Sequence, residues 1–206
     1  MLRKRSTLLK DRVATEAAVL LYSQQEKEYK QAKDKAASTL GARILPSNRA
    51  VAEELDRISD EGEGAFKRER LVRMRKEALS LMVMLGDFHP RLIGSVWRGT
   101  AHKNSDIDIE AFVPSPDAVL ERLYQNSLNV TKAEWQPMTK GKRIETAFHI
   151  YLRFSSGYQI EIVVRSPEKM SEIEKCEIYG DTIKGLNVHQ LRKVLIENPY
   201  QRFLPS

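Results

Sequence analysis

Apolar residues recur at helical spacing through the first 85 residues of the chain, and this pattern predicts helices. The first apolar stripe predicts one long helix over residues 8–38. The stripe consists of Leu9, Val13, Ala17, Leu20 and Leu21. From residue 24 to residue 35 the same helix is polar on nearly every side, so this half either is solvated or lies against a partner.

Breaks in the pattern set the limits of a second helix. Gly41 and Pro46 interrupt the first stripe, and Ser47 can cap a helix that we expect to end near Ser59. Acidic residues alternate with glycine over residues 60–64, where we expect a loop.

A third helix is expected over residues 66–85, with a basic first half and an apolar, buried second half. The basic half carries Lys67, Arg68, Arg70, Arg73, Arg75 and Lys76. Two interpretations stay open for these side chains: they meet nucleic-acid phosphates, or they pair with nearby carboxylates. The carboxylates in reach are Glu53, Glu54 and Glu69.

After residue 85 the pattern changes to short apolar runs between turn residues, which predicts strands. The expected strands end at Ile93, run over residues 106–113 and 129–135, and form a hairpin over residues 144–154 and 158–165. Further helices are expected from Pro116, with Ser115 as N-cap, and after Pro167 and Asn187. The fold class is therefore α/β (α+β): a small mixed sheet flanked by helices and preceded by a helical segment.

The composition is that of an ordinary soluble globular protein, because 41% of the residues are hydrophobic and 30% are charged. No apolar run approaches the roughly 20 residues that cross a bilayer, so we expect no membrane association. The basic start of the chain is followed by charged residues where a signal peptide needs an apolar segment. A single cysteine, Cys176, agrees with a reducing compartment, and we expect a cytoplasmic protein.

The net charge of +6 favours polyanions such as nucleic acid or nucleotide phosphates. It is equally compatible with a mildly basic intracellular protein that binds neither, so charge alone leaves the partner open.

The most informative residues are Gly94 and Ser95, followed ten residues later by Asp106 and Asp108. Carboxylates at positions i and i+2 of a strand project from the same face, about 7 Å apart, close enough to share divalent cations. Gly94 lacks a Cβ, so a phosphate can approach the backbone, and the Ser95 hydroxyl can donate a hydrogen bond to it. The combination indicates phosphoryl chemistry.

These two motifs, together with the spacer of residues 96–105, resemble the signature of the nucleotidyltransferase superfamily that includes DNA polymerase beta. The resemblance is strict over about twenty residues. It implies a nucleotidyltransferase catalytic domain over residues 66–166, after a helical segment over residues 1–65 and before a helical extension over residues 167–206. Residues 44–109 also resemble, less specifically, the catalytic head of archaeal-type CCA-adding enzymes, although the further tRNA-binding domains of those enzymes are not expected here.

The resemblance implies two Mg²⁺ ions, with Mn²⁺ as a possible replacement, held by Asp106, Asp108 and a third acid from a neighbouring strand. Glu161 is the chosen residue because it is the only carboxylate in a run otherwise suited to a sheet interior. It can act as a metal ligand or as the general base on the acceptor hydroxyl. Glu110 and Glu145 remain alternatives.

Ser95 is expected to bind the β or γ phosphate, helped by the N–H groups of the following turn and by the start of a short helix. Arg98 and Lys103 are further candidate phosphate ligands. For Lys103 a plain surface position is the alternative. The four histidines fall at no metal-ligand spacing, so we expect them at the surface or satisfied in the core.

The resemblance implies a nucleotidyltransferase that moves a nucleoside monophosphate from a nucleoside triphosphate such as ATP to an acceptor hydroxyl and releases pyrophosphate. The acceptor is RNA or a protein, and adenylylation of a protein or small molecule is the second enzymatic reading. A module that binds nucleotides or nucleic acid without catalysis is the third. The oligomeric state does not follow from the sequence.

Overall fold

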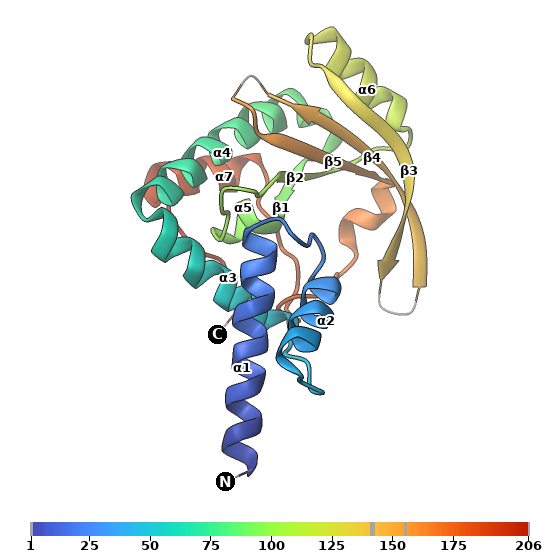
Figure 1. Ribbon diagram of the computed structural model, residues 1–206. Coiled ribbons are helices and arrows are strands. Elements are labelled where there is room, and N and C mark those ends of the chain that lie inside the picture. Colours follow the sequence, from blue (N-terminus) through green and yellow to red (C-terminus); the bar gives the residue numbers. More distant parts are fainter. Residues whose placement is uncertain (1, 141–142, 155, 206) are drawn as a thin grey trace.

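A five-stranded mixed sheet with strand order β1-β2-β5-β4-β3 lies at the centre of the larger part of the molecule (Figure 1). The computed structural model describes residues 2–140, 143–154 and 156–205. The strands are β1 (Arg91–Ile93), β2 (Ile107–Phe112), β3 (Val130–Lys140), β4 (Arg143–Arg153) and β5 (Gln159–Arg165). β2 and β5 are parallel and the other neighbours are antiparallel, which confirms the predicted fold class of a mixed sheet with helices.

Helices surround this sheet and extend from it on one side. The α-helices are α1 (Leu2–Tyr22), α2 (Tyr29–Leu40), α3 (Asn48–Glu63), α4 (Ala65–Met84), α5 (Gly94–Arg98), α6 (Pro116–Gln125) and α7 (Val188–Glu197). Two short 3-10 helices are η1 (Gly86–Phe88) and η2 (Pro167–Ser171). α4 and α7 pack together and, with α6, contribute apolar side chains to one hydrophobic core with the sheet.

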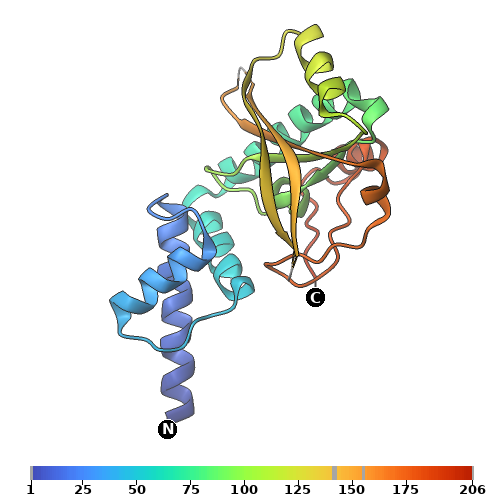
Figure 2. The same ribbon diagram turned by 90° about the vertical axis from the view of Figure 1, so that its right-hand side faces the viewer.

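A second hydrophobic core lies among α1, α2 and α3, which form a lobe beside the sheet (Figure 2). Small residues of α2 such as Ala32 and Ala36 are fully buried there against Val13 and Ala17 of α1. We call α1 to α3 the helical lobe. It has its own buried residues, so it is more than a solvated extension of the sheet.

The prediction of one helix over residues 8–38 was wrong, because a turn at residues 23–28 separates α1 from α2. Gln24 takes the left-handed conformation, with φ of 59°, and the N–H groups of Gln25 and Glu26 bond back to the carbonyl of Leu20. The reversal lets α2 fold back and bury its alanines against α1, whereas a continuous helix would leave them in water.

The capping predictions were confirmed where they depended on local chemistry. The Ser47 side chain accepts a hydrogen bond from the N–H of Ala50 at the start of α3, and Ser115 does the same for Asp117 at α6. Two boundaries were wrong: α3 continues through the expected loop to Glu63, and the helix expected after Pro167 is the short 3-10 helix η2.

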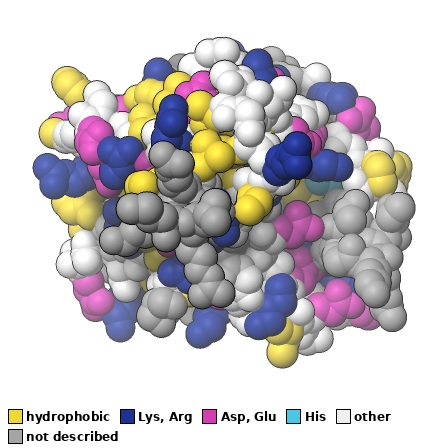
Figure 3. Space-filling model, turned by 60° about the horizontal axis from the view of Figure 1, so that its bottom comes forward, with side chains coloured by type: hydrophobic (Ala, Val, Ile, Leu, Met, Phe, Trp, Pro, Cys, Tyr) yellow, Lys and Arg dark blue, Asp and Glu magenta, His cyan; other side chains and the backbone are white. Residues whose placement is uncertain are grey.

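Three of the six basic side chains in the first half of α4 form contacts inside the molecule, whereas Arg68, Arg73 and Lys76 are exposed. Lys67 pairs with Asp56 at 2.6 Å and with Asp60 at 2.8 Å, and Arg70 pairs with Glu63. All three carboxylates differ from the expected ones, two of them because α3 continues past Ser59 to Glu63. The expected Glu69 lies 3.8 Å from Arg73. Among the side chains coloured in Figure 3, basic ones are interspersed with acidic and hydrophobic ones.

Arg75 of α4 fixes the short helix α5 against the last residues of the chain. Its buried guanidinium donates hydrogen bonds to the carbonyls of Val96 at 3.1 Å, Trp97 at 2.9 Å, Pro199 at 2.8 Å and Gln201 at 2.8 Å. Burial lowers the pKa of Arg75 to about 10. α5 is therefore held from behind by a charged side chain rather than by packing alone.

None of the described helices combines the length and the apolar character that a membrane crossing requires.

Candidate active site

The three predicted acids lie near the starts of the neighbouring strands β2 and β5, in the interior of the sheet. Asp108 of β2 is in register with Glu161 of β5 and, on its other side, with Ile93 of β1. Asp106 directly precedes β2, two residues before Asp108. The alternating residues Ile107 and Ile109 are fully buried, so β2 presents its acids on the face opposite the core.

Gly94 is required by the closeness of Asp108 to the backbone. Its φ is +69°, in the left-handed region, and a Cβ there would lie 2.8 Å from Cγ of Asp108 and collide with Oδ2. The carboxylate thus rests against the turn that connects β1 to α5. In this way the glycine motif and the acidic motif, ten residues apart in sequence, form one site.

Burial and neighbouring negative charges raise the pKa values of Asp106 and Asp108. Burial, followed by the charges of Glu161 and Asp106, raises the pKa of Asp108 to about 8. Burial, followed by the charge of Glu161, also raises the pKa of Asp106, and the positive charges of Lys27 and Arg153 act in the opposite direction. A site of this kind holds negative charge that a bound cation would offset.

Glu161 is oriented by two side chains of β4 that the sequence interpretation missed. Oε1 of Glu161 lies 2.6 Å from Nδ1 of His149 and accepts a hydrogen bond of 2.8 Å from the hydroxyl of Tyr151. Burial, and then this bond, raise the pKa of Tyr151 to about 12. The available signal was the alternation of His149 and Tyr151 with the apolar Phe148, Ile150 and Leu152, which places both side chains on the face of Glu161.

The two alternative acids have other partners. Glu110 is buried and bonds to Arg91 at 2.6 Å and Arg165 at 2.8 Å, so its charge is neutralised inside the protein. Glu145 pairs with Lys169 at 3.1 Å. Each therefore has a structural contact that explains its charge.

The predicted phosphate ligands differ in their surroundings. Ser95 is half-buried in the first turn of α5, beside Gly94. Arg98 is buried: its guanidinium bonds to Asp181 at 2.6 Å and to the carbonyl of Phe203 at 3.0 Å, and it stacks on Trp97. Phosphate binding by Arg98 stays a prediction, one that would require its release from Asp181.

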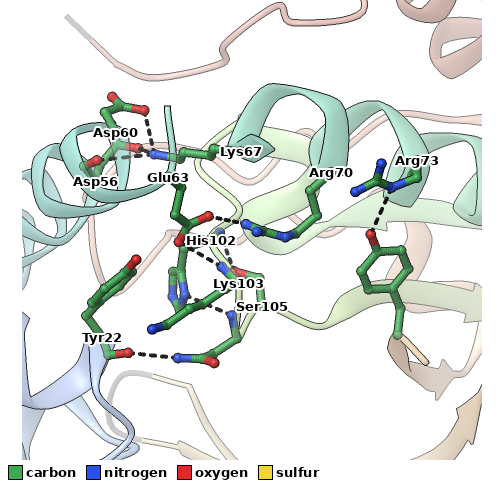
Figure 4. Close-up of polar contacts among 12 residues, drawn as sticks. Tyr22, Asp56, Asp60, Glu63, Lys67, Arg70, Arg73, His102, Lys103 and Ser105 are labelled. Atoms are coloured by element: carbon green, nitrogen blue, oxygen red, sulfur yellow. Dashed lines mark hydrogen bonds and ion pairs between the residues drawn. The ribbon is translucent and has the colours of Figure 1, made fainter. Parts of the chain in front are cut away.

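Lys103 is exposed, with its ammonium 4.2 Å from the centre of the Tyr22 ring. The loop around it is fixed to the helical lobe (Figure 4). The Lys103 N–H donates to Glu63 at 3.1 Å, and the Asn104 side chain donates to the carbonyl of Tyr22 at 2.8 Å. Because this loop leads directly into Asp106, the helical lobe supports the position of the acidic motif.

Two adjoining cavities open beside these residues. The larger, of about 490 Å³, is lined by Asp106 and Lys103 together with residues of the helical lobe. The smaller, of about 240 Å³, is mostly apolar and is lined by Gly94, Ser95 and Arg98. Tyr29, Leu55 and His102 line both, so the two cavities share a boundary. The larger volume suits a nucleotide-sized ligand.

Within the described part of the chain, no three His, Cys, Asp or Glu side chains are arranged around a common point as a ready metal site. The donor chemistry nevertheless fits a hard divalent cation, since three carboxylates in one electrostatic field offer only oxygen ligands. Asp106, Asp108 and Glu161 are the residues that would hold it.

Comparison with known proteins shows which class of domain this segment is similar to. Residues 84–180 match the family described as "Nucleotidyltransferase domain", and this segment includes the glycine turn and all three acids. The match covers a little under half of the chain, so this segment is similar to nucleotidyltransferase domains. The comparison with curated proteins gives no match.

Solved structures with partial similarity include a cytoplasmic RNA terminal U-transferase, with 19% identity, a TM-score of 0.33, and coverage of 47% of this chain and 29% of that one. They also include Cid1 in complex with the UTP analog UMPNPP, with 19% identity, a TM-score of 0.33, and coverage of 55% and 36%. The matched region spans about a third of the length of those proteins.

Proposed function

We propose that the protein transfers a nucleoside monophosphate from a nucleoside triphosphate to an acceptor hydroxyl, with release of pyrophosphate. The observation that carries the proposal is the contact between the two motifs: Asp108 lies in register with Glu161 and against the backbone of Gly94. A phosphate at the Gly94 and Ser95 turn would then be next to a cluster of carboxylates, which is the juxtaposition that nucleotidyl transfer requires.

In this proposal Asp106, Asp108 and Glu161 hold divalent cations, Mg²⁺ or Mn²⁺, which supply charge neutralisation and activation of the acceptor hydroxyl when bound. Ser95 and the first N–H groups of α5 bind triphosphate oxygens. The acceptor oxygen forms a bond to the α phosphorus while the bond from that phosphorus to the bridging oxygen breaks. The hydroxyl proton leaves to Glu161 or to solvent, and pyrophosphate departs.

RNA is the acceptor that we propose first, and a protein hydroxyl is the second. The basic net charge of +6 supports a polyanionic acceptor. The domain limits are proposed as 1–65 for the helical segment, 66–166 for the catalytic domain and 167–206 for the C-terminal extension.

The test is incubation with labelled ATP or UTP, Mg²⁺, and either cell RNA or cell protein. We expect label in one fraction together with stoichiometric pyrophosphate. Asp106→Ala should abolish both, whereas Glu121→Gln should retain them, because Glu121 is an exposed residue of α6 that does not line the cavities. Tight triphosphate binding without turnover on any acceptor would instead indicate a binding module.

A further inference from the structure

The turn between α1 and α2 lines the larger cavity together with Asp106, one of the predicted acids. Gln24, Glu26, Lys27 and Tyr29 line this cavity on the side of the helical lobe. The opposite side is lined by residues 102–106, which lead into the acidic strand, and by residues 157–159, which lead into β5. One wall of the cavity thus comes from a lobe outside the matched nucleotidyltransferase domain.

The turn has a defined backbone conformation. The N–H of Gln24 bonds to the carbonyl of Leu21 at 3.1 Å, and those of Gln25 and Glu26 bond to Leu20 at 3.0 and 3.2 Å. Gln24 adopts φ of 59°, which is unfavourable for a residue with a side chain and persists only when its surroundings enforce it. Lys27 is therefore presented from a fixed turn rather than from a free loop.

Lys27 carries a positive charge that no described carboxylate pairs with. Its neighbour Glu26 is paired with Lys35 at 2.9 Å. Within the described residues, no carboxylate lies at ion-pair distance from Lys27, whose side chain is exposed at the cavity. Lys27 and Asp106 line the same cavity, so the ammonium lies on the same hollow as the acidic motif.

We propose that the helical lobe forms the second wall of the substrate cleft and that Lys27 binds a phosphate group of the substrate there. The inference rests on the proposed function, which offers two sources of phosphate: the triphosphate of the nucleotide and the backbone of a nucleic-acid acceptor. A lysine suits this role because its ammonium is a point charge with three donors that can follow a phosphate.

The two walls are held at a fixed distance by the network in Figure 4. The Asn104 side chain bonds to the carbonyl of Tyr22 at the end of α1, and Glu63 of α3 bonds to both the Lys103 N–H and Arg70. The turn that presents Lys27 begins directly after Tyr22. A phosphate that binds between Lys27 and Asp106 would therefore enter a cleft whose two walls are already connected by hydrogen bonds.

The test compares Lys27→Gln with Lys30→Gln, which removes the same charge three residues away on an exposed position that does not line the cavity. Two probes are titrated against each protein in Mg²⁺: a non-hydrolysable ATP analogue and a single-stranded RNA oligonucleotide. We expect Lys27→Gln to weaken binding of at least one probe by about five- to ten-fold, as for an accessible charge-assisted contact, and Lys30→Gln to change it less than two-fold. Circular dichroism verifies that both variants are folded.

Weaker binding of the ATP analogue assigns the contact to the nucleotide, and weaker binding of the RNA assigns it to the acceptor. If Lys27 contacts the nucleotide, the ATP analogue should also slow the acylation of Lys27 but not that of Lys30. Equal affinities for all three proteins, an equal loss in Lys30→Gln, or no binding of either probe by the wild type would overturn the inference. A wild type that binds but never transfers would contradict the proposed function alone, because the Lys27 comparison does not depend on turnover.

Discussion

The ionised form of Asp108 opposes folding, and a single isosteric substitution measures this effect. The pKa of Asp108 is raised to about 8 by burial and by the neighbouring charges of Glu161 and Asp106. In an unfolded chain an aspartate titrates near pH 4, at about 3.9. Between these pH values the folded protein keeps a proton that the unfolded chain loses, so the free energy of unfolding falls as the pH rises from about 4 to about 8.

The magnitude follows from the same values. One pKa unit corresponds to about 1.4 kcal/mol, and pH 7 lies roughly three units above the unfolded pKa, so Asp108 lowers the free energy of unfolding at pH 7 by about 4 kcal/mol. Asp108→Asn removes the titration and keeps the shape of the side chain. In the absence of divalent ions we expect the variant to be more stable than the wild type by about 2–4 kcal/mol at pH 7, and by less than about 1 kcal/mol at pH 4.

The assay is urea denaturation in EDTA at both pH values, with Glu121→Gln as the exposed control. Addition of Mg²⁺ should then stabilise the wild type more than Asp108→Asn, because the cation offsets charge that the variant lacks. The reasoning would be refuted if Asp108→Asn were less stable than the wild type at pH 7. It would also be refuted if the difference were the same at pH 4 and pH 7.

Three further substitutions test the contacts around the site. Gly94→Ala should lower the rate of nucleotidyl transfer by about 100-fold or more, because the new Cβ displaces the Asp108 carboxylate. The rate of pyrophosphate release measures this effect, and near-normal activity would contradict the close contact. Arg75→Met should lower the free energy of unfolding by about 3 kcal/mol or more, because it leaves four backbone carbonyls without their hydrogen-bond donor. Urea denaturation measures this change, and a loss under about 1 kcal/mol would contradict the expected role of Arg75. Tyr151→Phe should lower kcat about ten-fold with KM unchanged, because Glu161 loses an orienting hydrogen bond. Steady-state kinetics measure both constants, and a change confined to KM would refute the orienting role of Tyr151.

Features that depend on nearby residues could be predicted from the sequence. Ser47 and Ser115 cap the helices that follow them because a hydroxyl beside a helix start satisfies a free N–H whatever the rest of the fold. The mixed sheet and the short helix after Gly94 were likewise predicted and observed. The alternation of Asp108 with the buried Ile107 and Ile109 also followed from the sequence, whereas Asp106 lies one residue before β2.

Features that depend on distant contacts could not be predicted. α2 folds back because its alanines pack against α1, and nothing in residues 24–35 alone indicates α1 as the packing partner. Arg98 looks like a phosphate ligand in sequence, but Asp181, more than eighty residues away, bonds to it. His149 was expected at the surface or in the core, and its contact with Glu161 arises only from the pairing of β4 with β5.

The contacts of Glu161 bear on the role that the sequence left open, metal ligand or general base. His149 and Tyr151 both reach Oε1, which leaves Oε2 as the oxygen without a described partner, in the field of two other acids. The Tyr151 hydroxyl donates to Oε1 and His149 lies within hydrogen-bond distance of it, so both contacts orient the carboxylate, which favours the role of ligand. Glu161→Gln keeps a side chain of the same length but lowers its affinity for cations. If Glu161 is a ligand, the Mg²⁺ concentration that gives half-maximal transfer should rise about ten-fold or more in Glu161→Gln. If it is the general base, the Mg²⁺ dependence should stay unchanged, and the rate should instead lose its rise with pH.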